Sequence, residues 1–229
     1  MRDVEQEFGE KSLRHEWFPV EGAKATIFIF PTVMGVSDLE RGFAATLNHK
    51  GHSALVADLY GARFTPDQRA DASAAMGALR GDRAGLRDLL TAVVEQARPL
   101  AGDSTIVAIG FCFGGQCTLD LARSGADVAG VASFHGLFDP PGLPLRAITA
   151  KVIAFHGWDD PLAKPESVVA LGEELTEAGC DWQIHGYGGV GHGFTNPAAK
   201  GAMPGVIYNE QAATRAWASF DAFLKECLA

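Results

Sequence analysis

Hydrophobic residues in this chain fall into short unbroken runs that alternate with longer segments in which they recur at helical spacing. The short runs are rich in β-branched and aromatic residues, as buried strands are. This alternation predicts an α/β fold, in which a mostly parallel sheet carries helices on both faces. The expected strands are residues 25–30, 53–57, 105–109, 128–134, 152–155 and 182–184, and the expected helices are residues 39–50, 82–98, 115–123, 165–178 and 209–228.

Serine and glycine mark several of the expected helix ends. Residues 37–40, Ser-Asp-Leu-Glu, form a helix-start pattern, and Gly51 and Gly179 stand where helices should stop. The stretch 61–81 is rich in alanine and aspartate, and we expect a cap loop with a short helix there. No internal repeat or linker divides the chain, so residues 1–229 are predicted to form a single domain.

The composition is that of a globular protein and argues against several partners. The chain has 229 residues, of which 47% are hydrophobic and 21% charged. Its net charge of −9, without a basic run, argues against nucleic acid and anionic lipid surfaces. Residues 1–7 are charged where a secretory signal would be apolar, and the longest apolar stretch, 25–36, falls short of the roughly 20 residues that span a bilayer. We therefore expect a cytoplasmic protein with no membrane partner.

The four cysteines show neither CxxC spacing nor a disulfide framework, so free thiols are expected. Cys117, Cys180 and Cys227 fall in helical or helix-end patterns, where cysteine is most often a small buried hydrophobic residue. Only Cys112 is placed to react. The histidines other than His192 show no clustered ligand spacing, and no metal site is expected.

Residues 110–114, Gly-Phe-Cys-Phe-Gly, lie between an expected strand and an expected helix. Small residues two positions before and two after a nucleophile allow the sharp strand-to-helix turn called a nucleophile elbow. The helix that follows would bring unpaired N–H groups and a positive dipole end to the Cys112 sulfur, which favours the thiolate. Taken alone, the motif also allows a purely structural interpretation, in which the cysteine between glycines serves only to pack the strand against the helix.

An acid and a base follow later strands in the order that α/β-hydrolases use. Asp160 lies in the turn after the fifth expected strand, and His192 lies in a glycine-rich loop after the sixth. Because ligand sites in open parallel sheets form at the carboxyl ends of strands, both are expected to meet Cys112. Alternatively, Asp160 could cap the helix that Pro165 opens, and His192 could be a satisfied loop histidine. The three residues in this order favour a hydrolase with a Cys112–His192–Asp160 triad.

Four motifs together resemble the dienelactone hydrolase family. They are GFCFGG, HGWDDPL, GVGHGF and the Asp-Leu-Tyr-Gly segment at 58–61, and the similarity runs from about residue 25 to residue 224. The cysteine at the elbow is the most specific part, since most α/β-hydrolases carry serine there. The resemblance implies an α/β-hydrolase fold and hydrolysis of an ester or lactone.

The family pattern also implies roles for individual positions. The triad acid would be Asp160, which is followed by a residue that begins a turn, with Asp159 as the alternative. The oxyanion hole would consist of the backbone N–H groups of Val33 and Phe113.

Two departures from the family pattern concern the substrate and the resting thiol. Thr32 stands where characterised members carry an acidic residue that pairs with the thiol, so the thiol must rest differently here. No arginine follows His192 closely to hold a substrate carboxylate, which leaves Arg69 as the candidate cation. We expect Thr32, Arg69 and Phe194 to contact the substrate, with the alternative that the Phe194 ring fills the core.

The favoured function is hydrolysis of a small-molecule ester or lactone through a thioester acyl-enzyme, without a cofactor, by a monomer or homodimer. A thioesterase, a general carboxylesterase or a small peptidase could use the same triad, because the triad specifies the reaction and not the acyl group. A member that kept the fold but lost turnover would instead bind a ligand, although the complete triad argues against this.

Overall fold

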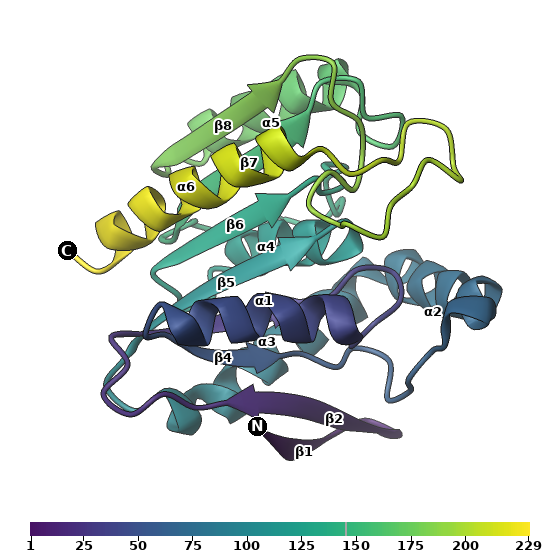
Figure 1. The fold of residues 1–229 in the computed structure, drawn as a ribbon. Coiled ribbons are helices and arrows are strands. Elements are labelled where there is room, and N and C mark those ends of the chain that lie inside the picture. Colours follow the sequence, from purple (N-terminus) through teal and green to yellow (C-terminus); the bar gives the residue numbers. More distant parts are fainter. Residues whose placement is uncertain (145) are drawn as a thin grey trace.

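The computed structural model describes residues 1–144 and 146–229, and a sheet of eight strands runs through them (Figure 1). Strands β3 to β8 run parallel to one another, while β1 and β2 form an antiparallel hairpin that pairs with β4. The order across the sheet is β1-β2-β4-β3-β5-β6-β7-β8, which confirms the predicted α/β class. The strands are β1 (Arg2–Phe8), β2 (Lys11–Phe18), β3 (Ala25–Phe30), β4 (Ser53–Val56), β5 (Thr105–Phe111), β6 (Gly130–Phe134), β7 (Lys151–Gly157) and β8 (Trp182–Tyr187).

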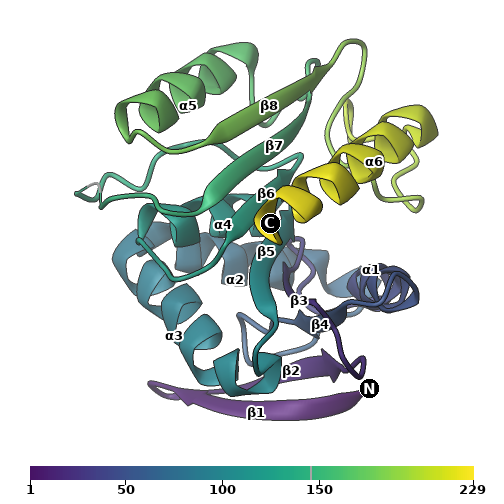
Figure 2. The ribbon, with the colours of Figure 1, turned by 90° about the vertical axis from the view of Figure 1, so that its left-hand side faces the viewer.

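Helices cover both faces of this sheet, as predicted (Figure 2). One face carries α1 and α6, and the other carries α3, α4 and α5. No helix within the described ranges is long enough and apolar enough to cross a bilayer. The helices are α1 (Asp38–His49), α2 (Arg69–Gly81), α3 (Arg83–Ala101), α4 (Phe113–Arg123), α5 (Pro165–Glu177) and α6 (Glu210–Cys227), with a 3-10 turn at Pro66–Gln68.

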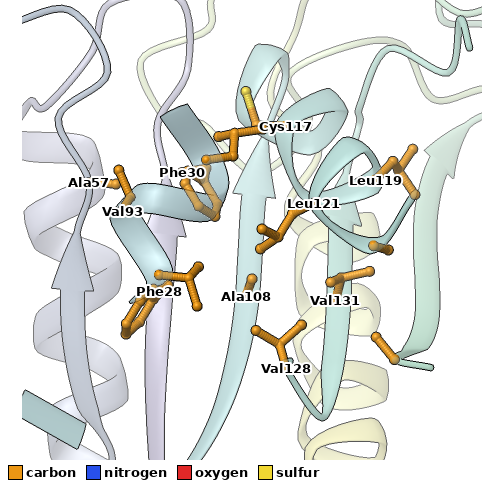
Figure 3. Close-up of a cluster of buried hydrophobic side chains, with 14 of the residues drawn as sticks. Phe28, Phe30, Ala57, Val93, Ala108, Cys117, Leu119, Leu121, Val128 and Val131 are labelled. Atoms are coloured by element: carbon orange, nitrogen blue, oxygen red, sulfur yellow. The ribbon is translucent and has the colours of Figure 1, made fainter. Parts of the chain in front are cut away.

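The two faces of the sheet have separate hydrophobic cores because side chains alternate along each strand. In β3, Phe28 and Phe30 pack with the helices α3 and α4, as Figure 3 shows. Ile27 and Ile29 pack on the opposite face with α1 and α6. All four side chains are fully buried, and each such burial stabilises the fold by about 1.5–3 kcal/mol. The unbroken apolar run that predicted this strand is therefore a consequence of burial on both faces.

Two elements differ from the sequence-based expectation. The cap region contains α2, a helix of 13 residues, where only a short helix within a loop was expected. Ala72 is its only fully buried residue, so the helix leaves little apolar periodicity in the sequence. The β1–β2 hairpin was not predicted at all, because the edge strand β1 is mostly exposed and rich in charged residues.

A buried cluster of charges ties three helices together on one face of the sheet. Asp120 of α4 accepts hydrogen bonds from Arg83 of α3, at 2.6 Å, and from Arg123 of its own helix, at 3.1 Å. Arg123 also bonds Glu174 of α5, at 2.6 Å. Asp120 is 1% exposed, so its charge depends on these partners for stabilisation.

Replacing Asp120 by alanine removes the buried acceptor that the two arginines share, and leaves Arg83 only Asp139 and Arg123 only Glu174 as carboxylate partners. We expect the free energy of unfolding to fall by about 3–5 kcal/mol in urea denaturation followed by circular dichroism. The matched control is Asp181→Ala, which removes the partner of Lys151 from an exposed ion pair and should have a far smaller effect. Equal losses in the two variants would contradict a stabilising role for the cluster.

Candidate active site

Cys112 occupies a strained turn between β5 and α4. Its φ of +58° lies in the region that side chains rarely adopt, a conformation that costs about 1–3 kcal/mol. Its backbone N–H donates to the carbonyl of Phe134 at the end of β6, at 3.0 Å, and its own carbonyl accepts from Gly115 of α4, also at 3.0 Å. The turn is therefore fixed from both sides, as the elbow motif predicts.

The glycines that flank the turn are required by close backbone packing. A Cβ atom on Gly110 would lie 1.9 Å from the carbonyl oxygen of Gly114, and a Cβ on Gly114 would lie 2.0 Å from that of Phe30. Real contacts are never this short, so neither position admits a side chain. The glycines allow α4 to start directly against β3 and β5, with Cys112 at the crossing.

The surroundings of Cys112 favour the thiolate. Burial raises the pKa of the thiol, but the nearby charge of His192 and the nearby N–H groups of Phe113 and Val33 more than offset this, and the pKa lies below its ordinary value. The two backbone N–H groups are those that were expected to form an oxyanion hole. Because both N–H groups lower the pKa of the thiol, both lie toward the sulfur.

His192 and Asp160 form a buried pair beside the thiol. The ring Nδ1 lies 2.7 Å from Asp160 Oδ2, and both side chains are at least 96% buried. Burial lowers the pKa of His192, but Cys112 and Asp160 raise it, and the net pKa is above the usual value. The ring Nε2 makes no hydrogen bond of good geometry with the described residues, so the mutual effect on the two pKa values rests on the closeness of the ring and the sulfur. Asp159 is exposed and takes no part in this pair.

A returning loop holds the histidine in place. The N–H of His192 donates to the carbonyl of Gly205 at 2.7 Å, and its carbonyl accepts from the N–H of Ile207 at 3.1 Å. A Cβ on Gly191 would lie 2.1 Å from the Gly205 oxygen, so the glycine before the histidine permits this approach. Gly205 in turn packs against Pro161, next to the acid, where a Cβ would lie 2.8 Å from the proline ring. One loop thus contacts both the base and the acid turn.

His135 is a neighbour of the site that the sequence analysis missed. Its ring lies 5.0 Å from that of His192 in an edge-to-face arrangement, and its Nε2 lies 2.8 Å from Thr195 Oγ1. Burial, followed by the charge of His192, lowers the pKa of His135 well below its usual value, so this ring is neutral. It directly follows β6, and the rule that sites gather at strand ends could have identified it.

The expected substrate contacts lie in different environments. Thr32 is half-buried in the loop that carries Val33, and Arg69 is exposed at the start of α2. Phe194 is fully buried, packed edge to face on His135 and Tyr187, so in this conformation it belongs to the core.

The remaining three cysteines are free, and the pKa of each is raised. Cys117 is fully buried in α4, and burial raises its pKa well above the ordinary value. Cys180 and Cys227 are half-buried, and burial raises the pKa of each. Cys112 is thus the one thiol of the four whose pKa is lowered.

A groove of about 680 Å³ between α5 and β8 is separate from the thiol. Its walls include Trp158, Val169, Trp182 and Ile184, and neither Cys112 nor any other proposed triad member lines it. We therefore do not assign the substrate to this groove.

Known proteins and solved structures resemble this chain over most of its length. The model of the dienelactone hydrolase family matches residues 18–228. A carboxymethylenebutenolidase from Rhodococcus opacus is 26% identical over 183 residues, which cover 76% of this chain and 71% of the relative. The solved structure named m3DLH is 32% identical with a TM-score of 0.90, over 100% of this chain and 98% of that one. A dienelactone hydrolase-like promiscuous phosphotriesterase from metagenomic libraries is 31% identical with a TM-score of 0.87, over 99% of this chain and 97% of that one.

Ultraviolet absorbance of the thiolate, followed as a function of pH, tests the state of Cys112. Because its pKa is lowered, we expect a thiolate to appear below the ordinary thiol range as pH rises, and to be lost in Cys112→Ala. In His192→Ala the transition should move to higher pH, since the neighbouring positive charge is gone. Cys180→Ala is the control and should leave it in place. A wild-type transition only at the ordinary thiol pKa would contradict this description of the site.

Gly114→Ala tests the packing of the elbow. The added Cβ would meet the Phe30 carbonyl, so we expect a loss of several kcal/mol of stability, within the range known for strained backbone positions, and a large drop in melting temperature. Gly77→Ala in α2 is the matched control. Its Cβ meets nothing within 4 Å, and a helical glycine-to-alanine change stabilises by up to about 1 kcal/mol. Similar melting temperatures for the two variants would exclude the proposed contact.

Proposed function

This chain belongs to the dienelactone hydrolase family and is a hydrolase of carboxylic esters, and we propose that it cleaves a small-molecule ester or lactone through a thioester on Cys112. The observation that carries the proposal is the position of one thiol between a buried His192–Asp160 pair and the N–H groups of Val33 and Phe113. Such a site supplies a nucleophile, a base and an oxyanion hole at one point.

In the proposed acylation, the Cys112 thiolate attacks the carbonyl carbon of the ester. The carbonyl π electrons move to oxygen, and the N–H groups of Val33 and Phe113 stabilise the oxyanion, each worth on the order of 3 kcal/mol. When the intermediate collapses, the C–O bond to the leaving group breaks. The departing alkoxide takes the proton from Nε2 of His192, and the acyl group remains on sulfur as a thioester.

Deacylation reverses the proton transfer. His192, now neutral and held by Asp160, accepts a proton from water, and the hydroxide attacks the thioester carbonyl. Collapse of the second intermediate breaks the C–S bond, releases the carboxylic acid and leaves the thiolate beside protonated His192. The resting ion pair is restored, and no step requires a cofactor or a metal ion.

Two side chains are our candidates for contacts with the substrate. Thr32 adjoins Val33 and is our candidate for a contact with the acyl group, while Arg69 is the candidate cation for a carboxylate. We propose that the chain acts as a single domain on small molecules, as a monomer or homodimer, without nucleic acid. A thioesterase would use the same residues, and the phosphotriesterase named among the structural neighbours makes a phosphotriester a second substrate to assay.

Hydrolysis of p-nitrophenyl acetate tests the proposed role of Cys112. We expect measurable kcat/KM in the wild type and a fall of roughly 10³-fold or more in Cys112→Ala, since the nucleophile is lost. Cys180→Ala, which removes a half-buried thiol elsewhere, should retain the wild-type rate. Cys112→Ser should lose most of the activity, because a serine hydroxyl does not ionise as the thiol does.

The assay has two results that would contradict the proposal. Unchanged hydrolysis in Cys112→Ala would place the reaction at another residue. Wild-type hydrolysis no faster than buffer, with aryl esters, a butenolide and an acyl thioester all tested, would favour the alternative of a non-catalytic ligand-binding member.

A further inference from the structure

Tyr60 lies in the loop after β4 and packs against the candidate active site. It is 9% exposed, and none of the steps proposed above uses it. Burial, followed by the nearby Cys117 and Cys112, raises the pKa of Tyr60, so its hydroxyl stays protonated and remains a hydrogen-bond donor.

The hydroxyl of Tyr60 contacts Val33, one of the two residues whose N–H groups form the proposed oxyanion hole. It donates to the backbone carbonyl of Val33 at 3.2 Å, next to the N–H group that faces the sulfur. The ring also packs on Gly35, where a Cβ would lie 3.1 Å from Cδ2 of the ring. Gly35 has a φ of +71° and donates to the carbonyl of Thr32 at 3.0 Å, so the loop bends tightly around the Tyr60 ring.

The ring of Tyr60 packs against Phe113, the residue that carries the second N–H group of the proposed oxyanion hole. It lies nearly parallel to the ring of Phe113, with the centroids 6.4 Å apart and an interplanar angle of 10°. Phe113 is fully buried and carries the second N–H group of the hole. One side chain therefore contacts both residues whose N–H groups face Cys112.

Two buried carboxylates fix the groups around Tyr60. Asp58 accepts from the N–H of Tyr60 at 3.0 Å and pairs with Arg63 at 2.9 Å, which anchors the tyrosine backbone. Glu40, fully buried at the start of α1, accepts from the N–H of Thr32 at 3.0 Å. The peptide that carries the Val33 N–H thus lies between an anchor at Thr32 and an anchor at the Val33 carbonyl.

We propose that Tyr60 is a positioning residue that aligns both halves of the oxyanion hole, through its hydroxyl on Val33 and its ring on Phe113. The inference rests on the proposed function, because it concerns the same reaction. Removing the hydroxyl frees the carbonyl of Val33, in the peptide next to the one that carries the N–H, and so loosens the backbone at Val33 while the Thr32–Gly35 bond, the ring and its packing remain. A donor misplaced by a fraction of an ångström stabilises the transition state less than a fixed one.

The test is Tyr60→Phe, assayed with p-nitrophenyl acetate and by thiolate absorbance. We expect kcat to fall about tenfold with KM changed less than about twofold, since the oxyanion forms only in the transition state. We also expect the thiolate transition of Cys112 to move to higher pH, because the Val33 N–H is no longer held toward the sulfur and stabilises the thiolate less. Tyr187→Phe is the matched control. Its buried hydroxyl makes no hydrogen bond with the described residues, so neither readout should change.

The two readouts separate the inference from the proposed function. A wild type without esterase activity would remove the proposed function, yet the thiolate transition would still test the contact between Tyr60 and the Val33 loop. A folded Tyr60→Phe protein with kcat and thiolate transition both unchanged would overturn the inference. A lower melting temperature with an unchanged thiolate transition would overturn it as well, because the tyrosine would then only stabilise the fold.

Discussion

The close crossing of β5, α4 and β3 at the elbow is the constraint on which the site depends. Only hydrogen fits on the Cα atoms of Gly110 and Gly114, and between them Cys112 is held at a φ of +58°. A relaxed turn would avoid this strain but would place the sulfur elsewhere. The strain is offset by the hydrophobic burial of α4, every residue of which is buried.

Three strand ends bring their groups to this one point. The loop after β3 supplies the Val33 N–H, the turn after β7 supplies Asp160, and the loop after β8 supplies His192. Each of these segments is fixed by hydrogen bonds that involve neither the thiol nor a substrate, such as the bond between Thr32 and Glu40. The site is therefore largely assembled before a substrate arrives, and such preorganisation is where electrostatic catalysis gains most of its free energy.

Much of this arrangement follows from the sequence, and the exceptions have physical reasons. The parallel strands and most helices were predicted because burial on one or both faces leaves apolar runs and helical periodicity. The edge strand β1 was not predicted, and α2 was expected only as a short helix within a loop, because both are largely exposed. The order of Cys112, Asp160 and His192 could be predicted from strand ends and glycines, and the structure brings the three together.

Long-range contacts account for what the sequence did not indicate. Neither the link between Tyr60 and Val33 nor the returning loop that holds His192 leaves a local pattern in the chain. Phe194 is a second residue whose surroundings are determined by long-range contacts. It was expected to contact the substrate, whereas tertiary packing buries its side chain completely.

The proposed function depends on acyl transfer through the sulfur of Cys112. The most direct measurement is mass spectrometry of the protein quenched in acid during turnover of p-nitrophenyl acetate. We expect one acetyl group, located on the peptide that contains Cys112, and its disappearance once the ester is consumed. An acetyl group on another residue that forms and decays at the rate of turnover would contradict it.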